Sequence, residues 1–496
     1  MSADVRVVKH DELYVRVFAE KSIVFELNEH FSFYVDGYKW MPKYKSGLWD
    51  GKIKLFNTRD RLLPVGLLLD LMKFCKRYSY TLEIENKQDI LPIDFSSDLD
   101  EFIADLPSIT KTPPSDEYQF QLDALKKCVK LNKSLTLSPT GSGKSHIIYL
   151  LVRFLLRYTE DPILICVPTT SLVEQMVSDF ASYANDDWDA ESECHKIYSG
   201  RDKMTDKRVT VTTWQSIYKL PVAWFRRYGT FICDEAHLAK SDSITGIVGK
   251  MRHSKFRFGF TGTLSDCKTN EMCLRGLFGV VTRTTTSSKL MDSGVLSKLK
   301  INAALLKYPK EESKWVAKMK YQEEIDWLVA HPSRNAFIIA SAFAQPQNTL
   351  VLFNYVEAHG KKLFERAQKA AARVGKEVFF VSGKTAVEER ERIRAIVEKQ
   401  NNVIVFASYG TFSTGINMKN LHTVIFAHPY KAKIKNLQSI GRVLRKSVGK
   451  DCATLIDIAD DLSYNKRQNL TLRHFVERTK IYDAEDFEYT IKKHNI

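Results

Sequence analysis

The chain has 496 residues, 44% of them hydrophobic, and a formal net charge of +15. This length predicts about three domains, and the composition excludes a globally disordered chain. The charge favours a polyanionic partner, although a merely basic protein would carry it too. No apolar run approaches the ~20 residues that span a bilayer, so we expect no membrane segment. The eight cysteines show no C-x-x-C spacing, and the first ten residues lack a signal-peptide core. We therefore expect a cytoplasmic protein without disulfides or zinc.

Residues 1–112 are expected to form a small α+β domain. Residues 5–8, 13–18, 23–27 and 31–35 are rich in β-formers and predict strands. Residues 66–80 carry the periodicity of an amphipathic helix. The boundary is placed at the proline pair 113–114.

A stretch rich in lysine and aromatic residues lies inside this first domain. From Tyr38 to Arg77 there are ten Lys and Arg residues against three Asp. Cations that meet phosphates and rings that stack on bases are typical of a nucleic-acid surface. A β-hairpin with buried aromatics and a solvated basic face explains the pattern equally well. The candidate contacts are Trp40, Lys43, Lys45, Trp49, Lys52, Lys54, Arg59 and Arg61.

The next stretch predicts a phosphate-binding loop. A short strand near residue 135 runs into a glycine-rich loop, and the apolar residues 147–156 predict a helix behind it. Glycines let backbone N–H groups surround phosphates, Lys144 would reach the β- and γ-phosphates, and Ser145 would hold Mg²⁺. The strict pattern has glycine where Ser138 stands, so this is a variant form. The expected nucleotide-binding loop is Ser138, Pro139, Thr140, Gly141, Ser142, Gly143, Lys144 and Ser145.

Two carboxylates follow a later strand in the sequence FICDEAH, residues 231–237. At a strand end, Asp234 is positioned to orient Mg²⁺ and its water shell, and Glu235 to polarise the attacking water. Ser145 and Asp234 are therefore the expected metal residues. Residues 113–288 are assigned to this first nucleotide-binding domain.

Residues 289–460 repeat the alternation of strands and helices and predict a second parallel-sheet domain. Near its end, Gln438, Gly441, Arg442 and Arg445 form a Gln-x-x-Gly-Arg-x-x-Arg motif. The two arginines share a helix face, and their planar guanidinium groups suit the charge of a transferring phosphoryl group. A basic helix face engaged in salt bridges is the alternative. Residues 461–496 are expected to be a C-terminal helical tail without chemistry.

Taken in order, these motifs resemble superfamily 2 helicases over roughly residues 115–460. The resemblance implies an α/β fold with two tandem RecA-like parallel-sheet domains behind the small N-terminal α+β domain. ATP and Mg²⁺ would be the cofactors, bound between the two motor domains. Arg442 and Arg445 would act as arginine fingers, with Gln438 beside them, so hydrolysis would need the two domains to close.

The same resemblance assigns roles to further residues. Phe120 and Gln121 would contact adenine, with Tyr118 and Gln119 as an out-of-frame competitor. Gly415 and Asn417 would also touch the nucleotide, although the family usually has an acidic residue where Asn417 stands. His237, Thr261 and Thr263 would couple the nucleotide to the nucleic acid. The implied nucleic-acid contacts of the motor are Thr169, Thr170, Thr213, Ser382, Lys384 and Thr411.

The nearest resemblance is to phage helicases of recombination and repair. It implies an ATP-dependent DNA helicase that unwinds or branch-migrates branched DNA and R-loops in recombination, repair and replication. We expect a monomer that binds branched DNA, single-stranded DNA and R-loops, works with recombination proteins and acts in the host cytoplasm if phage-encoded. An ATP-driven duplex translocase without strand separation, an RNA helicase and an inactive binding scaffold are the alternatives.

Overall fold

The computed structural model describes residues 3–238, 241–262, 268–415, 418, 420–429, 440–441 and 450–496. The chain forms two compact units. One contains residues 1–138 and 143–284, and the other contains residues 139–142 and 285–496. Each unit is described below by itself.

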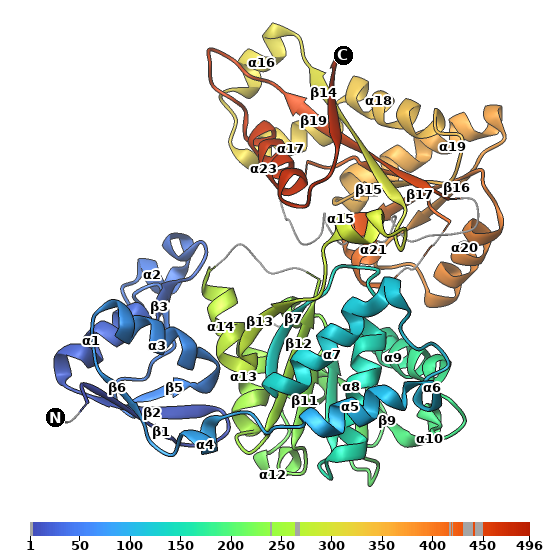
Figure 1. Cartoon of the computed structure of the whole chain (residues 1–496). Helices are drawn as coiled ribbons and strands as arrows, with labels where there is room; N and C mark the ends of the chain where they lie inside the picture. Colours follow the sequence, from blue (N-terminus) through green and yellow to red (C-terminus); the bar gives the residue numbers. More distant parts are fainter. Residues whose placement is uncertain are drawn as a thin grey trace. The chain divides into compact units, whose positions relative to one another are not determined.

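The N-terminal part of the first unit is a small mixed α/β domain (Figure 1). Its sheet has the strand order β5-β2-β1-β6. Strand β2 pairs antiparallel with β1 and β5, whereas β6 runs parallel to β1. Helices α1 and α3 share a hydrophobic core with this sheet. The elements are β1 (Val5–Lys9), β2 (Tyr14–Ala19), α1 (Lys21–His30), β5 (Leu62–Pro64), the 3₁₀ turn η2 (Val65–Leu67), α3 (Leu68–Arg77) and β6 (Leu82–Ile84).

One expected strand is wrong. Residues 23–27 lie inside helix α1. Ile23, Val24 and Leu27 are buried together, while Phe25 is 66% exposed. This spacing follows one face of a helix, and tertiary packing of that face outweighs the β propensity of the individual residues.

The first motor domain is a seven-stranded parallel sheet with the order β13-β7-β12-β11-β8-β10-β9. Four of its inner strands, β8, β10, β11 and β12, are buried at every position, as expected for a sheet covered on both faces. The strands are β7 (Lys133–Leu137), β8 (Ile163–Val167), β9 (Cys194–Ile197), β10 (Val209–Thr213), β11 (Thr230–Cys233), β12 (Phe256–Thr261) and β13 (Val280–Arg283). The main helices are α7 (Gln119–Leu131), α8 (Lys144–Tyr158), α9 (Thr170–Tyr183), α13 (Ser241–Lys250) and α14 (Lys268–Phe278).

Short helices complete this unit. They connect the N-terminal domain to the motor or follow the motor strands. These helices are α4 (Lys87–Ile90), α5 (Ser96–Ala104), α6 (Leu106–Ile109), η3 (Asp116–Tyr118), α10 (Ala190–Glu193), α11 (Trp214–Ile217), α12 (Val222–Phe225) and η4 (Ala236–Leu238).

Helix α14 joins the N-terminal domain to the first motor domain. Met272 of α14 belongs to the hydrophobic core of the N-terminal domain. Arg275 Nη2 lies 2.5 Å from Asp70 Oδ2, and both side chains are largely buried. Gly66 approaches so closely that a Cβ there would lie 2.0 Å from the Arg275 carbonyl oxygen. The two domains therefore share packed surface, and not only a linker.

The second unit is built on another seven-stranded parallel sheet, with the order β16-β17-β15-β18-β19-β14-β20. The two RecA-like sheets confirm the expected fold class. The strands are β14 (Lys298–Lys307), β15 (Thr349–Phe353), β16 (Glu377–Val381), β17 (Val403–Ser408), β18 (Thr423–Phe426), β19 (Cys452–Asp461) and β20 (Tyr489–Asn495). The helices are α15 (Ser287–Asp292), α16 (Lys310–Val316), α17 (Tyr321–Ala330), α18 (Pro332–Phe343), the π-helical turn η5 (Val356–Lys361), α19 (Lys362–Val374), α20 (Val387–Lys399), α21 (Tyr409–Gly415) and α23 (Leu470–Ala484).

The C-terminal tail was expected to be helical, but only part of it is. Helix α23 is followed by β20, which pairs parallel with β14 along the edge of the sheet. Figure 1 shows α23 and β20 beside β14 and β19. Within α23, Arg478 forms a two-bonded ion pair with Asp457 of β19, and both side chains are buried. The tail therefore completes this sheet, which periodicity alone could not reveal because β20 is a polar edge strand.

Within the described residues, we find no helix long and apolar enough to cross a membrane.

Buried histidines should make the second unit sensitive to acid. Burial, followed by the charge of Arg334, lowers the pKa of His428 to about 3. An unfolded histidine titrates near pH ~6.5, so below that pH only the unfolded chain takes up this proton. The contribution of His428 to the free energy of unfolding is fully present above pH ~6.5. It falls as the pH drops towards 3, and about 2 kcal/mol of it is lost at pH 5.

Thermal unfolding between pH 5 and 8 tests this expectation. The variant His428→Phe keeps a ring at this position and should flatten the acid side of the curve. The exposed His253 offers a matched control, because His253→Gln should leave the curve unchanged. An equally steep acid loss in His428→Phe would contradict the assignment.

Candidate functional site

The phosphate-binding loop joins the end of β7 to the start of α8. Gly143 is the N-cap of α8 with φ +78°, and Gly141 has φ +87°. Both values lie in the left-handed region that favours glycine. The free N–H groups at the start of this 15-residue helix, together with the positive end of its dipole, make a site suited to phosphate.

Lys144, the first residue of α8, reaches the carboxylates of the DEAH segment. Its Nζ lies 2.5 Å from Glu235 Oε1 and 3.4 Å from Asp234 Oδ1. Strand β12 lies between β7 and β11 in the sheet, so the carboxyl ends of these strands converge at one edge. The structure thus brings Lys144 together with two adjacent acids that lie far from it in the sequence, as expected for a nucleotide site.

The charges of this cluster depend on one another. Burial alone would lower the pKa of Lys144, but Asp234 and Glu235 raise it above its ordinary value. Burial raises the pKa of Asp234, and the Lys144 ammonium opposes that shift. Lys144 is therefore protonated and acts as the counter-charge of the two acids.

The DEAH segment is held in a strained conformation. Glu235 has φ +48°, which is unusual for a residue other than glycine. Its backbone N–H donates to Asp234 Oδ1 at 2.8 Å. His237 Nδ1 lies 2.6 Å from Thr261 Oγ1 and 3.3 Å from Glu235 Oε2. Two of the three expected coupling residues are thus in direct contact, at the end of β12 and beside the Glu235 carboxylate.

The structure distinguishes the two reading frames of the adenine-contact motif. Gln121 is 4% exposed, and its Oε1 lies 2.9 Å from His146 Nδ1. A Cβ on Gly143 would lie 2.3 Å from Gln121 Nε2, so the amide is packed against the phosphate-binding loop. Gln119, the competitor, is exposed. Phe120 is half-buried on the same helix, α7.

The motor residues that were expected to contact nucleic acid fall into two groups, which differ in their exposure to solvent. Thr170 and Lys384 are exposed. Thr169 is half-buried and is the N-cap of α9, because its Oγ1 accepts from the backbone N–H of Leu172. Thr213, Ser382 and Thr411 are buried.

The buried group is engaged inside the protein. Thr213 Oγ1 lies 2.9 Å from Ser216 Oγ, and Thr411 Oγ1 lies 2.8 Å from Ser408 Oγ. The backbone N–H of Ser382 donates to Thr385 Oγ1. These contacts shape the loops at the strand ends, so any contact of this group with nucleic acid would run mainly through backbone.

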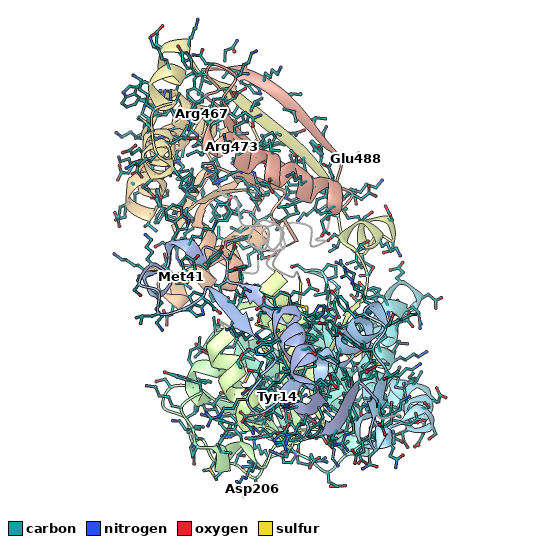
Figure 2. The ribbon with its side chains drawn as sticks, turned by 90° about the vertical axis from the view of Figure 1, so that its left-hand side faces the viewer. Tyr14, Met41, Asp206, Arg467, Arg473 and Glu488 are labelled. Atoms are coloured by element: carbon teal, nitrogen blue, oxygen red, sulfur yellow. The ribbon has the colours of Figure 1, made fainter. Side chains whose placement is uncertain are left out.

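The basic aromatic stretch forms an excursion between strands β3 (Ser32–Tyr34) and β4 (Lys52–Lys54). Within it, the turn η1 (Tyr38–Trp40) and helix α2 (Pro42–Lys45) bury no residue. Trp40 is 79% exposed and Leu48 is 83% exposed. We call residues 34–54 the aromatic knob; Met41, labelled in Figure 2, lies on it.

Inside the aromatic knob, several of the expected contacts have internal partners. Trp49 is half-buried and donates from Nε1 to the carbonyl oxygen of Lys52. Lys52 pairs with Glu29, and Lys54 pairs with Asp50, each at 2.8 Å. Lys45 lies over the ring of Trp40, with Nζ 5.6 Å from the ring centroid. The most available ring is therefore that of Trp40.

Some expected site residues lie outside the described part of the chain, namely Thr263, Asn417, Gln438, Arg442 and Arg445. Gly415 ends helix α21. His146, in contrast, was missed by the sequence reasoning. It directly follows Ser145 and contacts Gln121, but a lone histidine in an apolar helix carries no recognisable signal.

A phosphate-binding loop, a DEAH pair at the same edge of the sheet and a second RecA-like sheet define an ATP-dependent superfamily 2 motor. Three families match in succession. They are described as DNA helicase UvsW, N-terminal (residues 4–85), type III restriction enzyme, res subunit (residues 115–266) and helicase conserved C-terminal domain (residues 335–447).

The chain belongs to the UvsW family of ATP-dependent DNA helicases and is therefore an ATP-hydrolysing enzyme. It is 36% identical to the ATP-dependent DNA helicase uvsW of Enterobacteria phage T4, covering 99% of this chain and 100% of that protein. The crystal structure of T4 UvsW is similar at 35% identity, with a TM-score of 0.52 over 99% of both chains.

A more distant structure shares the fold alone. It is a fragment of an HsdR subunit of a type I restriction enzyme from Vibrio vulnificus, with a TM-score of 0.60 and 17% identity. The match covers 82% of this chain and 72% of that one.

Proposed function

We propose that the chain uses ATP to unwind or branch-migrate branched DNA and R-loops in recombination, repair and replication. The Lys144–Asp234–Glu235 cluster carries the proposal, because it supplies the groups for ATP hydrolysis in a chain of the UvsW family. DNA is the substrate class named for the T4 relative. The preference for branched substrates rests on the resemblance and on the aromatic knob.

Lys144 changes partners in this proposal. Without nucleotide it neutralises Asp234 and Glu235. The phosphates of ATP offer competing anionic oxygens at the start of α8, and Lys144 turns towards them. The two carboxylates then lose their counter-charge. Glu235 is free to orient a water and accept its proton, since its strained backbone already fixes the position of the side chain.

The residues fit Mg²⁺ as the second cofactor. The carboxylate of Asp234 and the hydroxyl of Ser145 are hard oxygen ligands, which Mg²⁺ prefers. The buried Asp234 carboxylate also needs a cation when Lys144 leaves it. When bound, Mg²⁺ supplies charge neutralisation on the phosphates. Ser145 and Asp234 would hold it.

The second unit completes the nucleotide site in this proposal. By family resemblance, Arg442 and Arg445 stabilise the charge of the transferring phosphoryl group, with Gln438, Gly415 and Asn417 beside the nucleotide. Both motor domains belong to one chain, so a monomer suffices. Recombination proteins as partners and the host cytoplasm as the location are proposed from the resemblance to phage helicases of recombination and repair.

The test compares ATP hydrolysis and strand release on four substrates: none, single-stranded DNA, forked DNA and an R-loop. We expect hydrolysis to rise most with the branched substrates and strand release to require ATP. Strong DNA-stimulated hydrolysis without strand release would instead establish a duplex translocase, which the fold shared with the HsdR fragment makes the main rival. Preference for an all-RNA fork would favour an RNA helicase.

The aromatic knob is proposed as the junction-recognition surface. It carries five lysines against two aspartates, Asp36 and Asp50, and places Trp40 and Leu48 in solvent. A large apolar ring beside Lys45 is costly to expose unless something stacks on it. Unpaired bases at a junction supply that stacking, while phosphates meet the lysines. Trp49, Lys52 and Lys54 support the knob from its base.

We expect Trp40→Ala to weaken binding to forked DNA about tenfold, because stacking of a base on an aromatic ring contributes ~1–3 kcal/mol. Fluorescence anisotropy with a labelled fork measures this effect, and ATP hydrolysis without DNA should not change. Trp315→Ala provides the control, because Trp315 is also exposed, at 56%, but lies on α16 of the second unit. Equal losses in both variants would contradict a specific role of the knob.

A further inference from the structure

His146 lies where the phosphate-binding loop meets the base-recognition motif. It is the third residue of α8, directly after Lys144 and Ser145, and is 5% exposed. Its ring packs nearly parallel to Tyr149 and edge-on to Tyr183, with centroids 6.2 and 4.8 Å away. These contacts fix the plane of the imidazole and leave it little freedom to rotate.

The protonation of the ring follows from its surroundings. Nδ1 faces Gln121 Oε1, an acceptor, at 2.9 Å, and therefore carries a proton. Nε2 is buried and has no hydrogen-bond partner in the described part of the chain. In the Nδ1–H tautomer, Nε2 carries an unprotonated lone pair, whereas the Nε2–H tautomer would bury an unpaired N–H donor.

This hydrogen bond decides which way the Gln121 amide faces. The amide has a donor end and an acceptor end of nearly the same shape. A donor at His146 Nδ1 holds the acceptor end, Oε1, and so turns Nε2 towards Gly143 of the phosphate-binding loop. An amide oxygen has two lone pairs, so Oε1 can accept a second hydrogen bond. The amide is thereby set in one orientation before nucleotide binds.

We propose that His146 is a positioning residue that orients the Gln121 amide for recognition of adenine and so makes the motor prefer ATP to GTP. The inference rests on the proposed contact between Gln121 and the base. The adenine edge presents a donor, N6–H, beside an acceptor, N7, and an oriented amide satisfies both. Guanine presents O6, an acceptor, in place of the N6 donor, and would face Oε1 with a second acceptor.

The variant His146→Phe keeps a ring of similar size and removes the donor. With the amide free to flip, KM for ATP should rise about fivefold to tenfold, in line with the loss of one hydrogen bond. KM for GTP should change little, and kcat should change less than twofold, since binding and not chemistry is affected. His146→Asn places an amide N–H near the position of Nδ1 and should restore most of the ATP preference.

The variant Gln121→Ala distinguishes a failure of the positioning role of His146 from a failure of the proposed contact between Gln121 and adenine. If Gln121→Ala leaves the ratio of kcat/KM for ATP and GTP unchanged, then Gln121 does not read the base, and the proposed adenine contact fails. If Gln121→Ala abolishes the preference but His146→Phe does not alter it, the positioning role fails alone. If both are correct, His146→Phe should have no further effect in the Gln121→Ala background.

Two controls exclude a merely structural effect. Thermal unfolding should show that His146→Phe and His146→Asn are folded at the assay temperature. Gln119→Ala, in the exposed competing frame, should leave both KM values unchanged. A uniform fall in kcat with both nucleotides in His146→Phe, not rescued by His146→Asn, would overturn the proposal in favour of simple packing.

Discussion

Replacing Lys144 by alanine should abolish ATP hydrolysis, with a fall in kcat of about 10³-fold or more. The ammonium group is the charge that would meet the β- and γ-phosphates, and removal of one preorganised electrostatic donor typically lowers kcat roughly 10²- to 10³-fold. The change also leaves Asp234 and Glu235 without their counter-charge in a largely buried site. Steady-state ATP hydrolysis with forked DNA measures the effect.

The matched variant Glu235→Gln should separate nucleotide binding from hydrolysis. The glutamine oxygen can still accept from Lys144, so the loop keeps its geometry and ATP should still bind. Hydrolysis should stop, because the amide cannot accept a proton from water. DNA binding should survive in both variants. Substantial hydrolysis by Lys144→Ala would contradict the assignment of this loop as the nucleotide site.

The second large effect concerns stability. Arg478→Met should lower the free energy of unfolding of the second unit by about 3–5 kcal/mol, because it leaves the buried Asp457 carboxylate without its cation. Tyr482 Oη donates to the same carboxylate at 2.8 Å but carries no positive charge. Denaturant unfolding followed by far-ultraviolet circular dichroism measures the loss.

Two further variants identify the cause of that loss. Asp457→Asn combined with Arg478→Met should be less destabilising than Arg478→Met alone, because no charge remains buried. Arg473 lies on the same helix, is exposed and is labelled in Figure 2, so Arg473→Met should change stability little. A loss of equal size in Arg473→Met would point to helix propensity instead of the ion pair.

Much of the fold could be predicted because its signals are local. Central strands of both parallel sheets, such as β8 and β15, are apolar runs, and the phosphate-binding loop and DEAH segment lie directly after buried strands. The strand predicted at residues 23–27 failed because β-formers also line one face of α1. Strand β20 was missed because it is polar on both faces and gains its place only by pairing with β14.

The site was predictable where chemistry requires particular residues at fixed spacing. Lys144, Asp234 and Glu235 do lie together. Availability to solvent was not predictable, because it depends on contacts made far along the chain. Trp49 and Lys52 resemble Trp40 and Lys45 in sequence, yet the first pair has hydrogen-bond partners inside the domain and the second pair lies in solvent. A role for His146 is indicated only by its hydrogen bond to Gln121, which lies on another helix.

The contribution of α14 to the N-terminal core sets the timing of folding during synthesis. Residues 5–75 leave the ribosome long before Met272, which completes their core. At ~5–20 residues per second, the ribosome needs roughly 10–40 s to cover that separation. The core of the first domain to be made is therefore completed only when the first motor domain supplies its missing side chain. An isolated N-terminal fragment would lack the Met272 side chain, so its core would stay incomplete.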